Sequence, residues 1–473
     1  LENVRCFGER QRLDLTNEKG ELAQWTLILG DNGVGKTTLL QCLVWMRPVL
    51  IFDKGSESSD PLSPLSKGVL GSALPEEEND ILERLLKIDG GSEIVMSAEV
   101  CQENDLVFDA VPTGKNIRTK IKVIFDEKGL LENFEQTRTN IEKKLKNEFF
   151  EPFIVAYGAN RQMGFQNVTN SELEDPLARR LSDVTELYDA EERLTKLHYA
   201  ATNKKYRRNK FSSDKNDKKG TDKKSTEERL LETFKQAIAA VLPDEVNSVD
   251  VIEIEAPKLE EGQLKESRVK LRTNDLSVPL SDLSLGYKTT LAWVLDLSWR
   301  LFNRYPKSSK PLEQPAVVII DEIDLHLHPL WQWRIMRMLA SVFKRTQFIA
   351  TAHSPLMVQS MPSANFAVIH KVDNEIKIEN KPEKVKGWRV DQILNSEYFG
   401  IPFSRDPDTE ELFKERAELI LKIRRNSDEE ERLQEIERQI QELPTGRISE
   451  EKEAEDLLRQ ATLLLKKSTT KAK

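Results

Sequence analysis

The sequence predicts an α/β fold built on a buried parallel sheet, and two segments carry that prediction. An apolar run at 25–29 leads into residues 30–37, which read GDNGVGKT, and a helix-like stretch follows them. A second continuous apolar run, 315–320, ends in the carboxylates Asp321 and Glu322. Continuous apolar strands are typical of parallel sheets covered on both faces, and such sheets present functional residues at the carboxyl ends of their strands.

Residues 30–37, called the phosphate loop below, match the pattern G-x-x-x-x-G-K-[ST] at every fixed position. A strand before the loop and a helix after it are the context in which this pattern binds a nucleoside triphosphate. Glycines let backbone N–H groups surround a phosphate, Lys36 reaches the outer phosphates, and the Thr37 hydroxyl can ligate magnesium. The alternative is a glycine-rich turn without a ligand, which the flanking strand and helix disfavour. The predicted nucleotide contacts are Gly30, Asn32, Gly33, Gly35, Lys36, Thr37 and Thr38.

Three further residues carry predicted chemistry around the triphosphate. Asp321, at the end of its apolar strand, is placed to hold the magnesium ion bound by Thr37. Glu322 is placed to orient or deprotonate the attacking water. His353 follows a separate short strand at 347–351, which would let its ring touch the outer phosphate and the water. The expected catalytic residues are Glu322, His353 and Lys36, with Thr37 and Asp321 as metal ligands.

Composition limits the class of protein. The chain has 473 residues and a net charge of −9, which argues against a surface devoted to nucleic acid but leaves room for a local basic strip. Its three cysteines lack C-x-x-C spacing and predict reduced core thiols in a cytoplasmic protein. The longest apolar runs, such as 316–320, are too short to span a bilayer, and no apolar leader is found. We therefore expect no membrane association.

Changes in pattern along the chain divide it into four predicted parts. Residues 1–165 and 246–395 form two halves of one lobe. Residues 166–245 are highly charged with helical spacing, which predicts an inserted helical arm. Residues 396–473 form a C-terminal helical region. Alternation of apolar and polar residues at 93–100 and 117–125 predicts antiparallel strands with one wet face.

One stretch of the arm, 204–224, carries ten basic residues against three acidic ones. Two interpretations remain open. Such a run is a solvated flexible linker at the tip of a helical hairpin, or it contacts a nucleic-acid backbone, since Lys and Arg release counterions from phosphates.

The C-terminal region has helical stretches at 410–423, 429–443 and 449–467, and the last two carry apolar stripes. A Pro-Thr-Gly turn at 444–446 separates these two stretches, which predicts an antiparallel hairpin or a docking arm. Packing within the chain and binding to a partner protein both remain open.

The order of these motifs resembles that of ABC-type ATPases. A phosphate loop is followed by a polar loop at 157–162, an L-S-x-G segment at 283–286, the Asp321-Glu322 pair and His353. The inserted arm resembles the SMC, RecF and OLD branch. The stretch 321–332, which begins DEIDLHLHP, is most similar to the PtuA-type ATPases of Septu and retron-associated antiphage defence systems. The resemblance implies an ABC-type P-loop cassette with a mixed parallel core sheet, an antiparallel sheet, the helical arm and the C-terminal helical region.

The resemblance implies that ATP and Mg²⁺ bind the phosphate loop and that Gln162 contacts the metal and the water. Asn160 and Arg161 are equally placed to face the nucleotide. His326 and His328 suggest either a metal site or structural hydrogen bonds, and their position beside the expected subunit boundary favours hydrogen bonding.

The resemblance also implies a head-to-tail homodimer or a larger homo-oligomer with shared sites. Ser284 and Gly286 would cap the γ-phosphate held by the other subunit, and Asp324 would lie at the dimer seam. Leu285 and Tyr287 depart from the family pattern L-S-G-G-Q. Their bulk predicts weaker closure over ATP and slow turnover.

These implications predict an ATP-dependent regulatory and scaffold subunit of a bacterial antiphage defence complex. After His353 we find neither an H-N-H cluster nor a Toprim-like spacing of acidic residues, so the sequence predicts an ATPase without its own nuclease site. The implied partners are a PtuB-like HNH nuclease, docked on the C-terminal helices, and a retron reverse transcriptase with its RNA–DNA hybrid. The alternative is an SMC- or RecF-like DNA-repair ATPase that contacts DNA directly through Lys204–Lys224.

Overall fold

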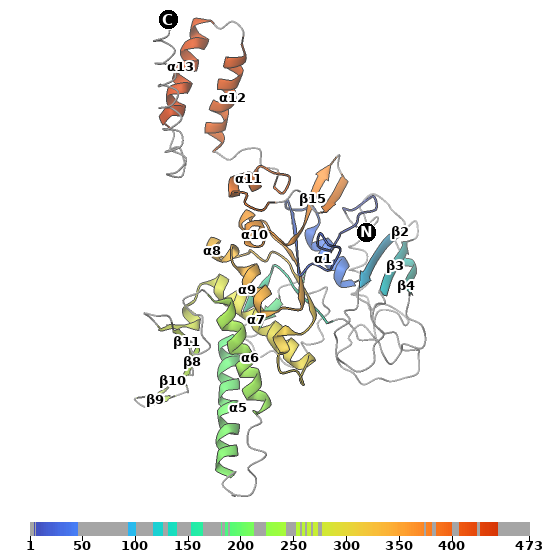
Figure 1. The fold of residues 1–473 in the computed structure, drawn as a ribbon, viewed down its shortest axis with the longest axis vertical. Helices are drawn as coiled ribbons and strands as arrows, with labels where there is room; N and C mark the ends of the chain where they lie inside the picture. Colours follow the sequence, from blue (N-terminus) through green and yellow to red (C-terminus); the bar gives the residue numbers. More distant parts are fainter. Residues whose placement is uncertain are drawn as a thin grey trace, which may run out of the picture. The chain divides into compact units, whose positions relative to one another are not determined.

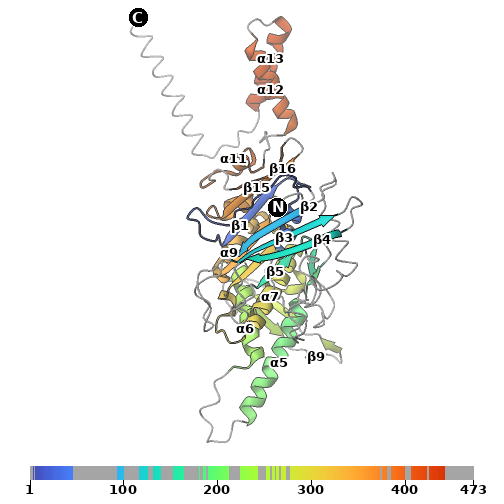
Figure 2. The same cartoon turned by 90° about the vertical axis from the view of Figure 1, so that its right-hand side faces the viewer.

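Two compact units make up the chain, residues 1–400 and 401–473. Figures 1 and 2 show the computed structural model of the protein. It describes residues 4, 6–45, 93–100, 117–125, 131–139, 153–163, 181, 185–187, 190–211, 224–242, 252–255, 258–260, 263–265, 268–272, 277–372, 375–380, 385–399, 406–422 and 426–442.

A six-stranded mixed sheet organises the first unit, in the order β16-β15-β1-β14-β13-β5. Its strands are β1 (Trp25–Gly30), β5 (Ile154–Tyr157), β13 (Ala316–Ile320), β14 (Thr346–Thr351), β15 (Asn365–Val372) and β16 (Glu375–Asn380). All neighbours run parallel except β16, which pairs antiparallel with β15 at one edge. The mixed parallel core sheet expected from the sequence is confirmed.

The register of the strands brings their carboxyl ends to one edge of the sheet. Ile320 of β13 pairs with Tyr157 of β5 and with Ala350 of β14, and Ile28 of β1 pairs with Thr351. The loops that follow these four strands therefore begin level with one another, which is where α/β sheets bind their ligands.

Alternate residues of a strand point to opposite faces, and each face of the sheet has its own apolar cluster. Leu27 and Val318 belong to the larger cluster, whereas their neighbours Ile28 and Ile319 belong to the smaller one. Helix α1 (Lys36–Trp45) packs on the smaller cluster. The larger cluster is covered by α6 (Thr226–Val241), α7 (Leu285–Arg304) and α9 (Ile335–Val342).

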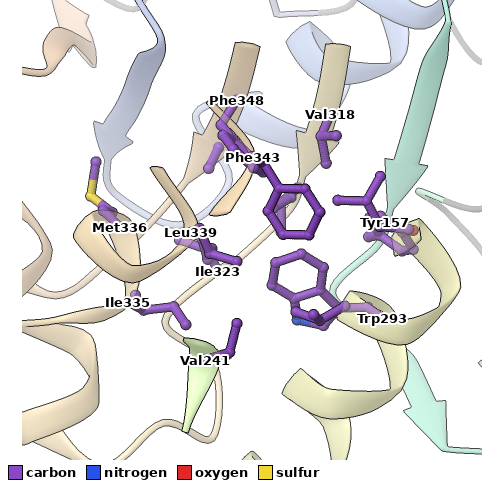
Figure 3. Close-up of a cluster of buried hydrophobic side chains, with 14 of the residues drawn as sticks. Tyr157, Val241, Trp293, Val318, Ile323, Ile335, Met336, Leu339, Phe343 and Phe348 are labelled. Carbon is purple, nitrogen blue, oxygen red and sulfur yellow. The ribbon is translucent and has the colours of Figure 1, made fainter. Parts of the chain in front are cut away.

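Figure 3 shows the centre of the larger cluster, where side chains of strands and helices meet. Trp293 of α7 and Val241 of α6 lie under the side chains of Val318 and Phe348, which come from adjacent strands. Phe348 also stacks on Trp25 of β1, with ring centroids 4.3 Å apart. Burial on both faces explains why β13 reads as a continuous apolar run in the sequence.

The remaining described strands form smaller sheets. They are β2 (Glu93–Val100), β3 (Ile117–Phe125) and β4 (Leu131–Thr139), in the order β2-β3-β4; β8 (Ile252–Glu255), β11 (Arg268–Arg272) and β12 (Ser277–Pro279), in the order β12-β11-β8; and the pairs β9 (Lys258–Glu260) with β10 (Gln263–Lys265), and β6 (Arg161–Met163) with β7 (Thr185–Leu187). The antiparallel pair predicted at 93–100 and 117–125 is confirmed. Strand β4 was not predicted.

The first unit also contains short helices. They are α8 (Pro329–Gln332), α10 (Pro355–Ser360), α11 (Val390–Leu394) and the 3₁₀ turns η5 (Leu280–Asp282) and η6 (Pro311–Glu313). Within the described parts of the chain, no helix combines the length and apolarity needed to cross a bilayer.

The helical arm contains α5 (Ala190–Phe211) and α6, which lie side by side (Figures 1 and 2). Ser225 starts α6 with a capping box, in which its hydroxyl accepts the Glu228 N–H and the Glu228 carboxylate accepts the Ser225 N–H. One face of α6, including Phe234 and Ile238, is buried in the larger cluster. The base of the arm is therefore part of the core of the first unit.

The basic stretch 204–224 begins inside α5, which stays helical to Phe211. Lys204 Nζ lies 2.6 Å from Glu227 Oε1 of α6. Residues 212–223, the middle of this stretch, lie outside the described residues, so both interpretations of the stretch stay predictions.

The second unit contains α12 (Pro407–Leu421) and α13 (Ser427–Glu442). Leu419 of α12 packs against Leu433 and Ile436 of α13, and Arg432 makes two hydrogen bonds to the Glu415 carboxylate. The apolar stripe predicted at 429–443 thus packs against the preceding helix. The helix predicted at 449–467 lies outside the described residues.

Replacing Tyr157 with Phe is expected to destabilise the first unit. The Tyr157 hydroxyl donates a 2.8 Å hydrogen bond to the buried Asp296 carboxylate, which also accepts a 2.7 Å bond from Arg300 Nε. We expect the Tyr157→Phe variant to lose about 2 kcal/mol of unfolding free energy in denaturant titrations.

Tyr305→Phe is the matched control, because the Tyr305 hydroxyl donates to the neutral carbonyl of Pro315. Its expected loss is about 1 kcal/mol, since bonds to charged acceptors contribute more than bonds to neutral ones. A Tyr157→Phe loss no larger than that of the control would contradict this assignment.

Candidate nucleotide site

The phosphate loop connects β1 to α1 and has a backbone that requires glycine. Gly30 and Gly35 have φ angles of 141° and 94°, which L side chains rarely adopt. A Cβ atom on Gly30 would lie 2.2 Å from the Ile369 carbonyl oxygen, and one on Gly35 would lie 2.3 Å from Cys6 Sγ. Gly33, with φ of 79°, faces open space. The loop is thus packed against Ile369 and Cys6 on one side and is open at Gly33, an arrangement that fits a phosphate group.

Lys36 holds its side chain across the loop. Its Nζ donates hydrogen bonds of 2.7 Å to the carbonyl oxygens of Gly30 and Asp31. Burial lowers the pKa of Lys36, and the carboxylates of Asp321 and Glu322 oppose that shift. An ammonium has three N–H donors, so the loop positions this cation while using two of them.

The Asp321 carboxylate connects the loop to the end of β13. Its Oδ2 accepts a 2.6 Å hydrogen bond from Thr37 Oγ1, and its Oδ1 accepts a 2.5 Å bond from Thr351 Oγ1. The structure therefore brings together the two residues predicted as metal ligands. Carboxylate and hydroxyl oxygens are the hard ligands that Mg²⁺ takes from proteins, so this pair fits the ion.

Thr351 was missed by the sequence analysis. It is fully buried at the carboxyl end of β14, and its hydroxyl also accepts the Glu322 N–H at 2.7 Å. A hydroxyl residue directly after the apolar run 348–350, two positions before His353, is the signal that could have identified it.

Glu322 follows Asp321 with φ of 47°, in the left-handed region. The side chain is half-buried, and its charge acts on both Lys36 and Arg161. The predicted base therefore lies near the predicted phosphate-binding cation.

His353 is fixed through its backbone. Its N–H donates a 2.9 Å hydrogen bond to Asp324 Oδ2, and Asp324 is only 8% exposed. Ser354 Oγ donates to Gln332, whose own amide donates to the carbonyls of Asp324 and Leu327. The segment after β14 is thus tied to the segment after β13. In this single chain, the Asp324 carboxylate is turned inward to hold His353.

The residues 283–287, called the signature segment below, start α7 and pack on the loop after Glu322. A Cβ atom on the buried Gly286 would lie 2.1 Å from the His326 carbonyl oxygen, so this position requires glycine. The Tyr287 ring packs edge-on against Trp331, with centroids 4.0 Å apart. Ser284 is the exposed N-cap residue of α7, and its side chain makes no capping hydrogen bond. Gly286 therefore contacts the 326–327 loop of its own chain.

The loop after β5 was predicted to offer three candidate nucleotide contacts. Asn160 is exposed, and the Gln162 side chain lies outside the described residues. The Arg161 side chain instead donates to the backbone carbonyls of Gly158, Asp321 and Glu322. Burial lowers the Arg161 pKa to about 10, which leaves the guanidinium protonated at neutral pH.

The two histidines after Asp324 have separate structural settings. His328 Nδ1 accepts the Leu330 N–H at 3.3 Å and caps α8, while His326 adopts a φ of 62°. In the portions of the chain that the structure describes, no group of three or more His, Cys, Asp or Glu side chains is arranged to hold a metal. The contacts favour the structural interpretation of His328.

A glycine cradle, a buried lysine, a Thr–Asp contact and an acidic strand end on a mixed parallel sheet define a P-loop ATPase. The chain belongs to the family described as "AAA domain, putative AbiEii toxin, Type IV TA system", which matches residues 26–358.

Individual relatives match shorter parts of the chain. It is 37% identical over 143 residues to the Septu protein PtuA of Bacillus mycoides (strain KBAB4), covering 30% of this chain and 19% of that protein. It is 29% identical over 205 residues to the Retron Vc95 probable ATPase of Vibrio cholerae serotype O1 biovar El Tor, covering 42% of this chain and 38% of that protein. The matches thus span less than half of either relative's length. The predicted similarity to PtuA-type and retron ATPases is confirmed.

Among solved structures, the SMC head domain from Thermotoga maritima aligns with 81% of this chain and 97% of its own, at 14% identity and a TM-score of 0.38.

Replacing Gly286 with Ala is expected to destabilise the first unit, because the added Cβ would collide with the His326 backbone. We expect a loss of about 2 kcal/mol in unfolding free energy, the usual cost of overpacking. The neighbouring Leu285→Ala is the control, since Leu285 is 57% exposed and its truncation should change stability by less than about 0.5 kcal/mol. Equal stability of the two variants in denaturant titrations would refute the packing role of Gly286.

Proposed function

We propose that this chain binds and hydrolyses ATP with Mg²⁺ and serves as the regulatory and scaffold subunit of a cytoplasmic bacterial antiphage defence complex. Its membership of the P-loop ATPases is the starting point. The observation that carries the catalytic assignment is the 2.6 Å hydrogen bond between Thr37 and Asp321, which joins two segments 284 positions apart.

Each site residue has a proposed role. The backbone N–H groups of the phosphate loop and the Lys36 ammonium bind the outer phosphates. Thr37 and Asp321 hold Mg²⁺, which neutralises charge on the phosphate oxygens when it is bound. The Glu322 carboxylate orients the attacking water and accepts its proton. His353 touches the outer phosphate, and the Asp324 bond to its N–H fixes the backbone from which the ring extends.

The complete site is proposed to form between two copies of the chain. Ser284 and Leu285 are exposed at the start of α7, and Leu330 is 62% exposed on the adjoining segment. Gly286 contacts the same segment, so these residues share one surface that a second copy could cover. Ser284 would meet the γ-phosphate held by that copy. Because Leu285 replaces the small residue of the family pattern, we propose slow turnover.

Two substitutions test the site. Lys36→Ala removes the cation of the phosphate loop and is expected to abolish retention of radiolabelled ATP. Glu322→Gln keeps the shape of the side chain but removes the base, so ATP should be retained while phosphate release falls by about 10² to 10⁴-fold.

Glu379→Gln is the matched control for this test, since it makes the same change on β16, where Glu379 pairs with His370. It should hydrolyse ATP at the wild-type rate. Normal hydrolysis by Glu322→Gln would sink the assignment of the base.

We further propose that the chain acts with a separate nuclease and carries no nuclease site of its own. The named relatives are a Septu protein and a retron ATPase. On that basis the proposed partners are a PtuB-like HNH nuclease and, in a retron setting, a reverse transcriptase with its RNA–DNA hybrid. The C-terminal helices are the proposed docking site, because Ile420 and Leu421 at the end of α12 are 46% and 81% exposed.

Replacing both Ile420 and Leu421 with Asp is expected to reduce recovery of a co-expressed PtuB-like HNH nuclease in a pull-down. Both side chains are exposed, so the substitutions should leave the α12–α13 hairpin folded. Tyr199→Asp is the control, because Tyr199 is 64% exposed on α5 of the other unit. Recovery equal to that of the wild-type chain would reject this docking site.

A further inference from the structure

Arg161 is a buried cation for which the proposed chemistry has no role. Its side chain is part of a residue only 4% exposed, at the start of the strand after β5. Nη1 donates to the Gly158 carbonyl at 2.8 Å and to the Asp321 carbonyl at 2.6 Å. Nη2 donates to the Glu322 carbonyl at 3.0 Å. Both terminal nitrogens are thus engaged by backbone.

The residue that receives this contact has a strained backbone. Glu322 has φ of 47°, and a left-handed conformation of a residue other than glycine costs about 1 to 3 kcal/mol. Such a conformation persists only where several contacts determine it together. Here the Glu322 N–H donates to Thr351 Oγ1 at 2.7 Å, and the Glu322 carbonyl accepts from Arg161 and from the Leu325 N–H.

The contacts lie on both sides of the Glu322 Cα. Arg161 holds the carbonyl of the preceding peptide and that of the following one, whereas Thr351 holds the intervening N–H. Fixing both peptide planes fixes φ and ψ, and with them the direction in which the side chain leaves the backbone.

On the β14 side, the Ile323 N–H still donates to the Thr351 carbonyl at 3.0 Å, but on the β5 side the sheet supplies no such restraint. Pairing of β13 with β5 ends with the Asp321 N–H donating to the Tyr157 carbonyl at 2.8 Å. Beyond that bond Glu322 adopts a left-handed conformation and the chain no longer pairs with β5. The Arg161 guanidinium extends the connection between the two segments by one residue.

We propose that Arg161 is a positioning residue for the hydrolysis described above: its guanidinium fixes the backbone of Asp321 and Glu322, so that the Glu322 carboxylate is directed at the water. This inference rests on the proposed function. Three of the five N–H groups of Arg161 donate to backbone carbonyl oxygens, so its contacts are with the backbone of the site. The planar guanidinium of arginine has several N–H groups in fixed directions and can bridge three carbonyls. The ammonium of lysine has its donors on a single nitrogen and cannot span them in the same way.

Arg161→Lys keeps the positive charge but removes the guanidinium group that bridges the three carbonyls. We expect its affinity for a fluorescent ATP analogue and its KM to stay within about threefold of wild type, while kcat falls by about 10 to 100-fold, as expected for a misplaced catalytic group. The matched control is Arg229→Lys on α6, because Arg229 also donates through both terminal nitrogens to backbone carbonyls, those of Pro306 and Ser308. Its kcat should be unchanged.

Hydrogen exchange supplies a readout that does not depend on turnover. In Arg161→Lys the amides of 321–325 should exchange faster, whereas those of β1 and α1 should not change. Wild-type kcat in Arg161→Lys, or unchanged exchange at 321–325, overturns the inference. If Arg161→Lys loses nucleotide binding and its amides exchange faster throughout the first unit, Arg161 has a general role in folding, and the inference is also overturned. If wild type and Arg161→Lys hydrolyse ATP equally well, the inference fails but the proposed function stands. If wild type shows no ATPase activity, both the proposed function and the inference fail.

Discussion

Both oxygens of the Asp321 carboxylate accept hydroxyl hydrogen bonds, and the rest of the site depends on these two bonds. Thr37 reaches Asp321 from the start of α1, and Thr351 reaches it from the end of β14. Because β14 lies between β1 and β13 in the sheet, the carboxylate joins the ends of three consecutive strands. Hydrogen bonds to a charged acceptor contribute about 1.5 to 3 kcal/mol each, so the phosphate loop and the acidic strand end are held in one arrangement.

The buried charges around Asp321 compensate one another. Isolated ions are costly to bury, yet Lys36, Arg161, Asp321 and Asp324 are all less than 9% exposed. The carboxylates of Asp321, Glu322 and Asp324 act on both cations and oppose the effect of burial on their pKa values. Each cation also donates to backbone carbonyls. These charged side chains are therefore already ordered in the folded chain, so they need to reorganise little when a ligand binds.

The central sheet and the fixed positions of the phosphate loop could be predicted, because each leaves a local pattern in the sequence. Strand β13 is a continuous apolar run, and the loop has glycines at set intervals. Strand β4 escaped prediction because its sequence, LENFEQTRT, is mostly polar. In the sequence analysis, Arg161 is named only as a candidate nucleotide contact and Thr351 is not named. Their contacts with Asp321 and Glu322 arise from strand register across 160 and 30 positions, which no local pattern records.

One departure from the family signature, Tyr287, is explained by packing within the chain. Tyr287 packs against Trp331, and Gly286 lies against the His326 carbonyl, so the signature segment and the loop after Glu322 form one surface. Gln332 connects that loop to Ser354, next to His353. A displacement of the signature segment would therefore move the backbone that supports Asp324 and His353. Tyr287 stands where the family pattern has glutamine, and its ring packs against Trp331 of the same chain. This contact couples the start of α7 to the proposed catalytic edge of the sheet.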